Sequence, residues 1–214
     1  MHNVVLVSRD GAALEKIKSK YPSQVQVVPG DLSDFTLPSK AVEVAKSSFG
    51  GLDGLIVNHA VLGQVAKIAE ADPEKWRGAF DVNVFSAIAC VQAALPELRK
   101  SKGCILLTSS GAAVKGTPSW GSYGASKACL NHLALTLQAE EPNITTMAIR
   151  PGQVDTEMQR DIREKHRDEM DHKVWSTYFN AHKEGKLLRP DQPGNVMARL
   201  VLDPPRDLNG KFIK

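Results

Sequence analysis

Short apolar runs alternate with longer segments of helical periodicity along the whole 214-residue chain. The apolar runs predict strands at residues 4–7, 25–28, 55–57, 105–108, 144–149 and 211–213. The segments between them predict helices at residues 11–20, 38–49, 73–100, 122–140 and 191–202, with a kink or restart at Pro96 in the third. Strict alternation of strand and helix predicts parallel strands joined by right-handed crossovers. We therefore expect an α/β fold with a doubly wound parallel sheet.

Polar turns follow the carboxyl ends of these predicted strands. In doubly wound sheets, ligands bind beyond that edge of the sheet. The turns are Ser8-Arg9, Asp31-Leu32, Asn58-His59-Ala60, Ser109-Ser110 and Pro151-Gly152. We expect the chemistry of the protein to lie among them.

The composition is that of an ordinary soluble single domain, with 42% hydrophobic and 24% charged residues. A formal net charge of +3 without any basic run does not favour a nucleic-acid partner. Cys90, Cys104 and Cys129 lack ligand-like spacing, so we expect buried free thiols, a reducing compartment and no metal site. Neither a signal peptide nor an apolar run near 20 residues is evident, so we expect a cytoplasmic protein without a membrane partner.

The sequence Gly-Ser-Tyr-Gly-Ala-Ser-Lys places Tyr123 four residues before Lys127, thirteen residues after Ser110. On a helix, positions i and i+4 share a face, so the phenol and the ammonium are expected in one site. A nearby cation favours the phenolate, so we expect a lowered pKa for Tyr123 and a role in proton transfer. Chance alone often produces this spacing. Ser110 at a strand end makes chance a poorer explanation.

Longer stretches carry a resemblance to a known family. They are residues 109–113, 123–127, 131–132 and 151–158. Together they resemble the short-chain dehydrogenase/reductase family of Rossmann-type oxidoreductases. The similarity is greatest to its fungal sepiapterin-reductase-like and benzil-reductase-like branch. The resemblance implies reduction of a ketone or aldehyde, including a diketone or a pterin-like carbonyl, with NADPH.

By this resemblance, Tyr123 is the catalytic acid and base, and Ser110 orients the substrate carbonyl. Lys127 would lower the pKa of Tyr123 and bind the nicotinamide ribose. Asn83, in Asp81-Val82-Asn83-Val84, would hold a water of the proton relay. The alternative for Asn83 is a polar core residue whose hydrogen bonds are satisfied.

The resemblance also implies an adenosine site. Asp31 would contact the adenine ring, with Leu32 beside it, whereas the alternative for Asp31 is an Asx turn or a helix cap. Asn58 and Ala60 would line the adenosine ribose. Arg9 follows the first predicted strand, where a carboxylate suits NAD and an arginine suits the 2′-phosphate of NADP.

The turn at Asn58 departs from the family pattern Asn-Asn-Ala-Gly. His59 replaces the second asparagine and Val61 replaces the glycine. We expect His59 to be a turn residue rather than a catalyst or a metal ligand.

At the nicotinamide end, the resemblance implies contacts from Pro151, Gly152, Val154 and Thr156, besides Tyr123 and Lys127. The substrate would meet Ser110, Trp120, Gln153, Trp175 and Tyr178. Residues 157–186 correspond to a substrate lid. The alternative is a solvated amphipathic helix whose aromatic residues pack on the domain.

The first βα unit of the family is not recognisable in this sequence. Residues 4–7 match the family's second strand, and no Thr-Gly-x-x-x-Gly-x-Gly turn comes after them. We expect residues 1–214 to form one domain that lacks this unit, and the natural coding sequence to begin upstream of Met1. The strands at residues 4–7 and 55–57 would then have unpaired edges or close up against each other. The alternative function is therefore a non-catalytic homologue that cannot bind cofactor.

The long helices that carry Asn83 and Tyr123 are the usual contact between subunits in the family. We expect a homodimer or homotetramer.

Overall fold

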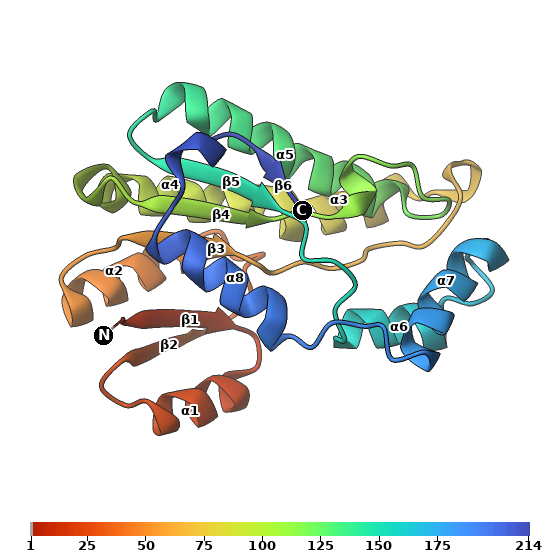
Figure 1. Ribbon diagram of the computed structural model, residues 1–214, viewed down its shortest axis with the longest axis horizontal. Helices are drawn as coiled ribbons and strands as arrows, with labels where there is room; N and C mark the ends of the chain where they lie inside the picture. The colour runs from red at the N-terminus through yellow and green to blue at the C-terminus, as the bar shows by residue number, and fades with distance from the viewer. Residues whose placement is uncertain (1) are drawn as a thin grey trace.

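Parallel strands form two separate sheets in the computed structural model, which describes residues 2–214 (Figure 1). One sheet pairs β1 (Val4–Ser8) with β2 (Val25–Pro29). The other has the order β3 (Gly54–Val57), β4 (Cys104–Thr108), β5 (Thr145–Ile149) and β6 (Phe212–Ile213). Every pairing is parallel. The expected α/β Rossmann-type fold is confirmed, with strand limits within about a residue or two of those predicted.

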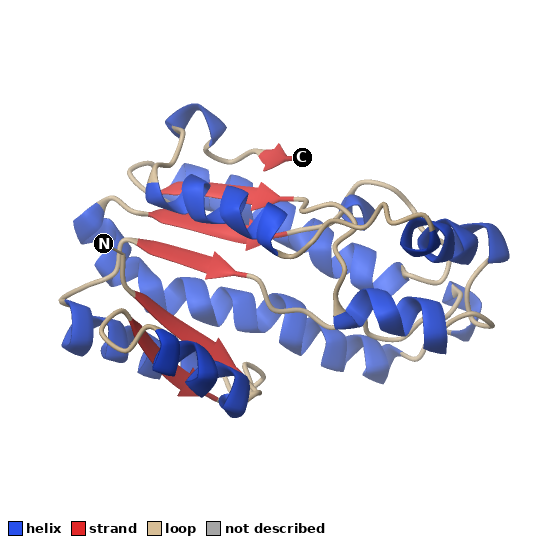
Figure 2. Cartoon of the chain, turned by 60° about the horizontal axis from the view of Figure 1, so that its bottom comes forward, coloured by secondary structure: helices blue, strands red, loops and turns tan. Residues whose placement is uncertain are grey.

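The two sheets meet at open edges. Figures 1 and 2 show β1 on the side of β3 that faces away from β4, and no ladder joins β1 to β3 in residues 2–214. In a parallel ladder, every second residue of a strand directs its backbone N–H and C=O to the same neighbouring strand. The bonds from Val4 N to Gln24 O and from Cys104 N to Asp53 O show which residues of β1 and β3 point to their partners. Val5 and Val7 therefore direct their backbone groups to the open side, as do residues 54 and 56. Of the two outcomes expected for these strands, the structure has the unpaired edges.

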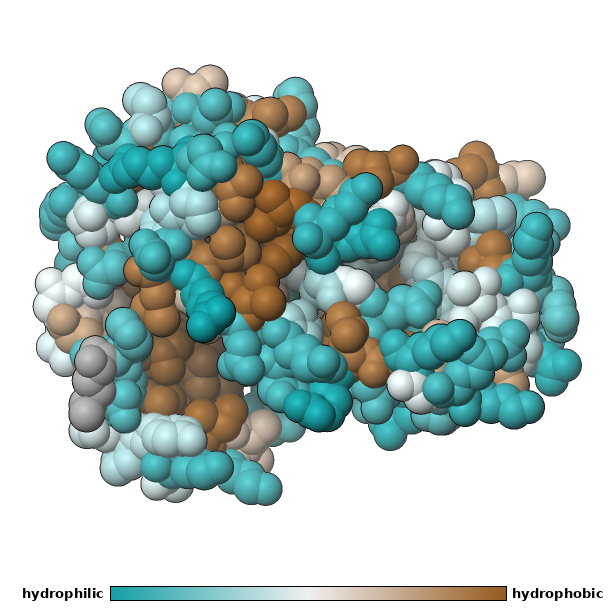
Figure 3. Space-filling model, viewed as in Figure 1, coloured by the Kyte–Doolittle hydropathy of each residue, from teal (hydrophilic) through white to brown (hydrophobic). Residues whose placement is uncertain are grey.

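Burial differs accordingly between the strands. All residues of β4 and β5 are buried, whereas Val4 of β1 is 43% exposed and Ile56 of β3 is 41% exposed. Figure 3 shows apolar surface over the region of β1, β2 and the nearby helix α8 (Asp191–Leu202). The core of the molecule therefore lies in the four-stranded sheet.

Helices cover both faces of the strands. α1 (Gly11–Lys20) contacts β1 and β2, and the Asp10 side chain caps it by accepting from Ala13 N. α2 (Leu37–Phe49) packs on β1, on β2 and on helix α4, so it links the two sheets. α8 packs on β3 and β4 on the opposite face, where Gly54 leaves room for Val201.

A continuous helical segment covers residues 73–101. It comprises α3 (Pro73–Phe80), a π-helical turn η2 (Asp81–Phe85) and α4 (Ser86–Ser101). By length and composition it could cross a membrane, contrary to the expectation from sequence. However, its apolar residues Ala87, Val91, Ala94 and Leu98 are buried in the main core. The helix does not restart at Pro96, and the change of helical type lies at the π-helical turn.

α5 (Gly121–Glu140) packs on β4 and β5 beside α4, and completes the main core with Leu130, Ala134 and Leu137. α6 (Glu157–Lys165) and α7 (His172–Lys183) project from the carboxyl end of the strands. Short 3₁₀ helices lie at η1 (Ile68–Glu70), η3 (Gly111–Ala113) and η4 (Arg206–Leu208).

The three cysteines are free thiols, as expected, but only Cys104 is fully buried. Cys90 is half-buried and Cys129 is exposed, because it lies on the side of α5 that faces away from the sheet. Burial raises the pKa of Cys90 to about 11 and that of Cys104 to about 12.

Candidate active site

Ser110 and Tyr123 meet at the carboxyl edge of the four-stranded sheet. Ser110 lies after β4 and caps η3 by accepting from Ala112 N, while Tyr123 is in the first turn of α5. α5 can approach η3 because Gly124 has no side chain: a Cβ there would lie 2.8 Å from Ala112 O. Burial raises the pKa of Tyr123, and a hydrogen bond with Ser110 opposes that rise in part. The structure therefore brings the two predicted hydroxyl groups together.

Lys127 lies behind Tyr123 and is 1% exposed. Its Nζ donates to Thr108 O at 2.6 Å and lies 5.8 Å from the centroid of the Tyr123 ring. Burial lowers the pKa of Lys127 to about 8. The ammonium makes one hydrogen bond within residues 2–214, which leaves two of its donors for a ligand.

The expected lowering of the Tyr123 pKa is wrong for this structure. Burial raises the pKa of Tyr123, and the hydrogen bond with Ser110 opposes this effect only in part. Lys127 does not offset the burial, because its ammonium is bound to Thr108 O rather than to the phenol. Tyr123 is accordingly a protonated donor at neutral pH.

Asn83 lies in the π-helical turn and is 1% exposed. Its Oδ1 accepts from Val61 N at 2.8 Å, and its Nδ2 donates to Val61 O at 2.8 Å and to Ser126 Oγ at 3.1 Å. Asn83 thus ties the turn after β3 to α5. These bonds agree with the alternative interpretation of Asn83 as a polar core residue whose hydrogen bonds are satisfied. A role for Asn83 in a proton relay stays a prediction.

The turn after β3 is fixed by two further bonds. Asn58 Oδ1 accepts from Thr108 Oγ1 at 3.0 Å, and His59 Nε2 lies 2.6 Å from Ser86 Oγ. Burial and the Lys127 charge lower the pKa of His59 to about 4, so its ring is neutral. His59 is a turn residue, as expected. Ala60 is half-buried in the same turn.

Arg9, Asp31 and Leu32, three of the residues expected at the adenosine end of a cofactor, lie at the ends of β1 and β2. Asp31 Oδ1 accepts from Ser33 N at 2.9 Å, which is the Asx turn of the alternative. The pKa of Asp31 is lowered by the hydrogen bonds from Ser33, and also by the charge of Arg9. Arg9 is exposed and Leu32 is half-buried. The structure therefore groups Arg9, Asp31 and His59 along one edge, although the edge between β1 and β3 is open.

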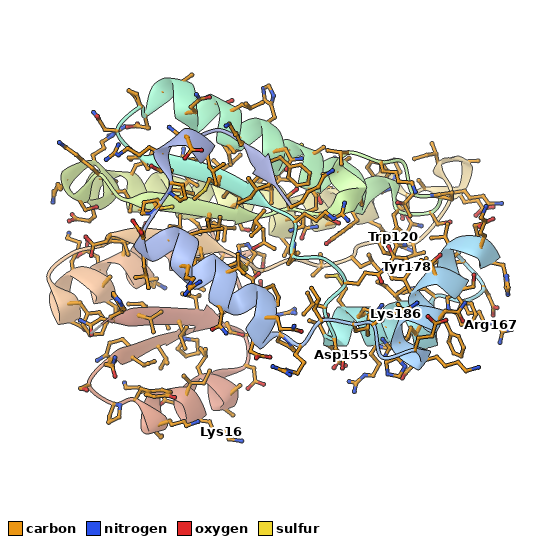
Figure 4. The ribbon with its side chains drawn as sticks, viewed as in Figure 1. Lys16, Trp120, Asp155, Arg167, Tyr178 and Lys186 are labelled. Carbon is orange, nitrogen blue, oxygen red and sulfur yellow. The ribbon has the colours of Figure 1, made fainter. Side chains whose placement is uncertain are left out.

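Aromatic residues form a wall beside Tyr123. The Trp120 ring lies edge-on to Tyr123 at 5.8 Å between centroids and tilted on Tyr178 at 5.1 Å. Figure 4 shows Trp120 and Tyr178 side by side between the sheet and α7. Trp175 instead packs inside the lid: it stacks on Phe179 and donates from Nε1 to Arg163 O at 3.1 Å.

The segment after β5 forms the base of the lid. Gly152 has a φ of +89°, which favours glycine, and Gln153 O accepts from Leu188 N at 2.8 Å. Val154 pairs with Leu188 in an isolated bridge, and Thr156 caps α6. Pro151 is half-buried just before this turn. These residues therefore have structural roles in addition to those expected of them at a nicotinamide.

Sequence reasoning missed the residues that orient the site. Thr108 holds Lys127 and Asn58, Ser86 holds His59, and Ser126 and Val61 hold Asn83. The bonds with Thr108 O, Val61 N and Val61 O use backbone groups, for which a sequence carries no signal. The hydroxyls of Thr108, Ser86 and Ser126 were the available indications.

Residues 2–167 match the family model of short chain dehydrogenases. An uncharacterized oxidoreductase of Schizosaccharomyces pombe is 38% identical over 213 residues, which are 99% of this chain and 85% of the relative. A benzil reductase of Saccharomyces cerevisiae, named as (S)-benzoin forming, is 36% identical over 97% of this chain and 83% of the relative.

Solved structures agree with these relatives. The crystal structure of the KRED1-Pglu enzyme superimposes with a TM-score of 0.96 at 37% identity, over 98% of this chain and 88% of that one. A short chain dehydrogenase/reductase of Saccharomyces cerevisiae gives a TM-score of 0.96 at 36% identity, over 99% and 84% of the two chains.

Proposed function

Because the chain belongs to the short-chain dehydrogenase/reductase family, we propose that this oxidoreductase reduces a ketone or an aldehyde to an alcohol with NADPH. The observation that carries the proposal is the pairing of Ser110 and Tyr123 in front of the buried Lys127, at the carboxyl edge of the sheet. The aromatic wall of Trp120 and Tyr178 adjoins this pair and favours an aromatic substrate, including a diketone. The relative named benzil reductase supports the same class of substrate.

The residues present fit a nicotinamide cofactor with a 2′-phosphate. The two free donors of Lys127 suit the hydroxyl groups of a ribose, and the exposed guanidinium of Arg9 suits a phosphate. Asp31, Leu32, Asn58 and Ala60 would hold the adenosine end. Pro151, Gly152, Val154 and Thr156 would hold the nicotinamide end. When bound, the cofactor supplies the hydride.

The residues of the chain supply orientation and the proton. The hydroxyls of Ser110 and Tyr123 would both donate to the substrate carbonyl oxygen, which fixes the carbonyl and polarises it. Tyr123 would then give its proton to the same oxygen as charge develops there. The ammonium of Lys127 would stabilise the resulting phenolate. Asn83, through Ser126 and the Val61 turn, would keep α5 in place during this step.

The direct test measures the oxidation of NADPH with benzil as the substrate, followed by its absorbance. We expect turnover, and a weaker response with NADH than with NADPH. Turnover that requires NADH, or that prefers it, would contradict the role given to Arg9. Failure with benzil, simple ketones and aldehydes alike would contradict the proposed function.

The second candidate is a non-catalytic homologue that does not bind cofactor, and the open edge between β1 and β3 is the observation that favours it. A thermal-shift titration with NADPH separates the two candidates, since a ligand that binds the native state raises the melting temperature. A shift at micromolar NADPH supports the reductase, whereas no shift up to millimolar NADPH supports the non-catalytic homologue.

We propose further that the protein is a cytoplasmic homodimer or homotetramer. Free thiols suit a reducing compartment, and the outer faces of α4 and α5 present apolar residues, among them Leu135 at 51% exposure. Size-exclusion chromatography should show more than one subunit, and a strictly monomeric protein would contradict the assembly.

A further inference from the structure

Arg150 places a guanidinium beside the residue after Ser110. It comes directly after β5, and its backbone is held in place because Arg150 N donates to Ile213 O at 2.9 Å. Its side chain lies along Gly111: a Cβ at Gly111 would be 3.3 Å from Arg150 Nη1 and 3.5 Å from Arg150 Cζ. The absence of a side chain at Gly111 therefore permits the guanidinium to lie against the residue that follows Ser110.

The Arg150 side chain has neither a carboxylate partner nor a hydrogen bond within residues 2–214. Three other exposed arginines have carboxylate partners: Arg99 pairs with Glu141, Arg160 with Glu157 and Arg189 with Asp191. The charge of Arg150 instead acts on Tyr178, whose pKa it lowers against the effect of burial. Arg150 is thus an unpaired cation within electrostatic reach of the aromatic wall.

This arrangement offers donors for two substrate oxygens. Ser110 and Tyr123 are suited to one carbonyl oxygen, and the guanidinium beside them presents a planar fork of further donors. A ketone with a single oxygen would leave that fork without an acceptor. A vicinal dicarbonyl carries a second oxygen on the adjacent carbon, and the guanidinium alongside Gly111, the residue after Ser110, offers that oxygen a donor.

We propose that Arg150 is a specificity-determining residue that binds the second, non-reacting carbonyl oxygen of an aromatic vicinal diketone. The inference rests on the proposed function for the identity of the reacting carbonyl. Hydride and proton add across the carbonyl held by Ser110 and Tyr123, and the second carbonyl is unchanged. The product is accordingly an α-hydroxyketone.

The test compares 1-phenyl-1,2-propanedione with propiophenone, which has the same skeleton without the second carbonyl. In Arg150→Met we expect kcat/KM for the dione to fall about 10- to 100-fold, as for a lost hydrogen bond to a charged group, and that for propiophenone to change less than about threefold. Arg150→Lys should restore part of the loss, since it keeps the charge without the fork. Arg160→Met is the control, because it removes an exposed lid arginine that is paired with Glu157.

Equal losses with both substrates, or no loss with the dione, would overturn the proposal. Calorimetric binding of the two compounds gives a readout that does not depend on turnover. Wild type should bind the dione more tightly than propiophenone, and Arg150→Met should bind them equally. If wild type turns over neither compound yet shows this binding difference, the proposed function fails and the role of Arg150 stands. If binding does not discriminate, the role of Arg150 fails whatever the activity. Diones can add covalently to arginine, so the intact mass is checked after each titration.

Discussion

The two sheets of this molecule hold the two halves of the candidate site, and they differ in how firmly their neighbours fix them. In the four-stranded sheet, β4 and β5 are buried along their whole length, and Ser110, Tyr123 and Lys127 are carried by the end of β4 and by α5. In the two-stranded sheet, none of the residues of β1 is fully buried, and Arg9 and Asp31 are exposed at its carboxyl edge.

Hydrogen bonds show the same division. Asn83, Lys127, His59 and Asn58 connect β3, β4, α4 and α5 to one another. Between β1 and β3, residues 2–214 provide no ladder at all, and α2 holds the sheets together by packing. A two-stranded unit has little stability of its own. The residues that we propose for proton transfer are thus pre-positioned, whereas those proposed for cofactor selection depend on a weaker part of the fold.

The largest effect on activity is expected at Tyr123, in the part of the candidate site that the four-stranded sheet carries. Tyr123→Phe removes the proton donor and should lower kcat by about 10³-fold, within the range for general acid catalysis. The thermal shift with NADPH should persist, because Arg9, Asp31 and Leu32, which would hold the phosphate and the adenine, lie at the other sheet. Tyr21→Phe, at the exposed end of α1, is the matched control. Undiminished turnover in Tyr123→Phe would remove the catalytic role from this half.

Asn83→Ala tests how much the hydrogen bonds of Asn83, which join the turn after β3 to α5, contribute to stability. It leaves Val61 N–H and C=O without partners, which should lower the free energy of unfolding by about 2–4 kcal/mol in urea titrations. Asn131→Ala is the control, since the Asn131 side chain makes no hydrogen bond in the described chain and its Oδ1 is an unpartnered buried atom. Similar values for the two variants would show that Asn83 is not a structural tie.

The buried ammonium of Lys127 should make stability depend on pH. The unfolded chain holds the Lys127 proton up to a pKa of about 10.4, whereas the folded protein holds it only up to about 8. Between these values the unfolded state binds more protons, so stability rises with pH.

Relative to Lys127→Met, wild type should therefore gain about 2–3 kcal/mol of unfolding free energy from pH 8 to pH 10.5. Below pH 8 the full destabilisation by the buried charge is present. Lys16→Met, on α1, should behave as wild type across the range. If Lys127→Met also parallels wild type, the ammonium is not the group that titrates.

Hydrogen exchange should show the open edge directly. In β1, the amides of Val5 and Val7 face the unpaired side, so we expect them to exchange at least about tenfold faster than that of Leu6. β4 has a neighbouring strand on both sides, so the amides that point to β3 and those that point to β5 should all be protected. Equal protection of Val5, Val7 and Leu6 in β1 would mean that its outer edge is covered in solution, and the contrast between the two halves would lose its basis.

The sequence was sufficient for the fold and for the catalytic cluster, because periodicity places the strands and their C-terminal turns meet at one edge of the sheet. For the edges of the strands at residues 4–7 and 55–57 it left two outcomes open, and the structure has the unpaired edges. The sequence failed for the pKa of Tyr123, because the burial of this side chain depends on its neighbours in space. Trp120 lies just before the predicted helix of Tyr123, and Tyr178 belongs to a remote segment of the chain. The π-helical turn that presents Asn83 was missed, since one extra residue in a helical turn leaves no mark in apolar spacing.

The pairing of Val154 with Leu188 has one more consequence. The chain leaves the sheet domain at Val154 and returns beside it at Leu188. The segment between these residues therefore begins and ends at the same place in the fold. Insertions, deletions or whole replacements within that segment would change the distance between its ends very little, and longer loops add only slowly to the entropy of closure. We therefore expect that the segment between Val154 and Leu188 can be exchanged between relatives while the sheet and Tyr123 stay as they are.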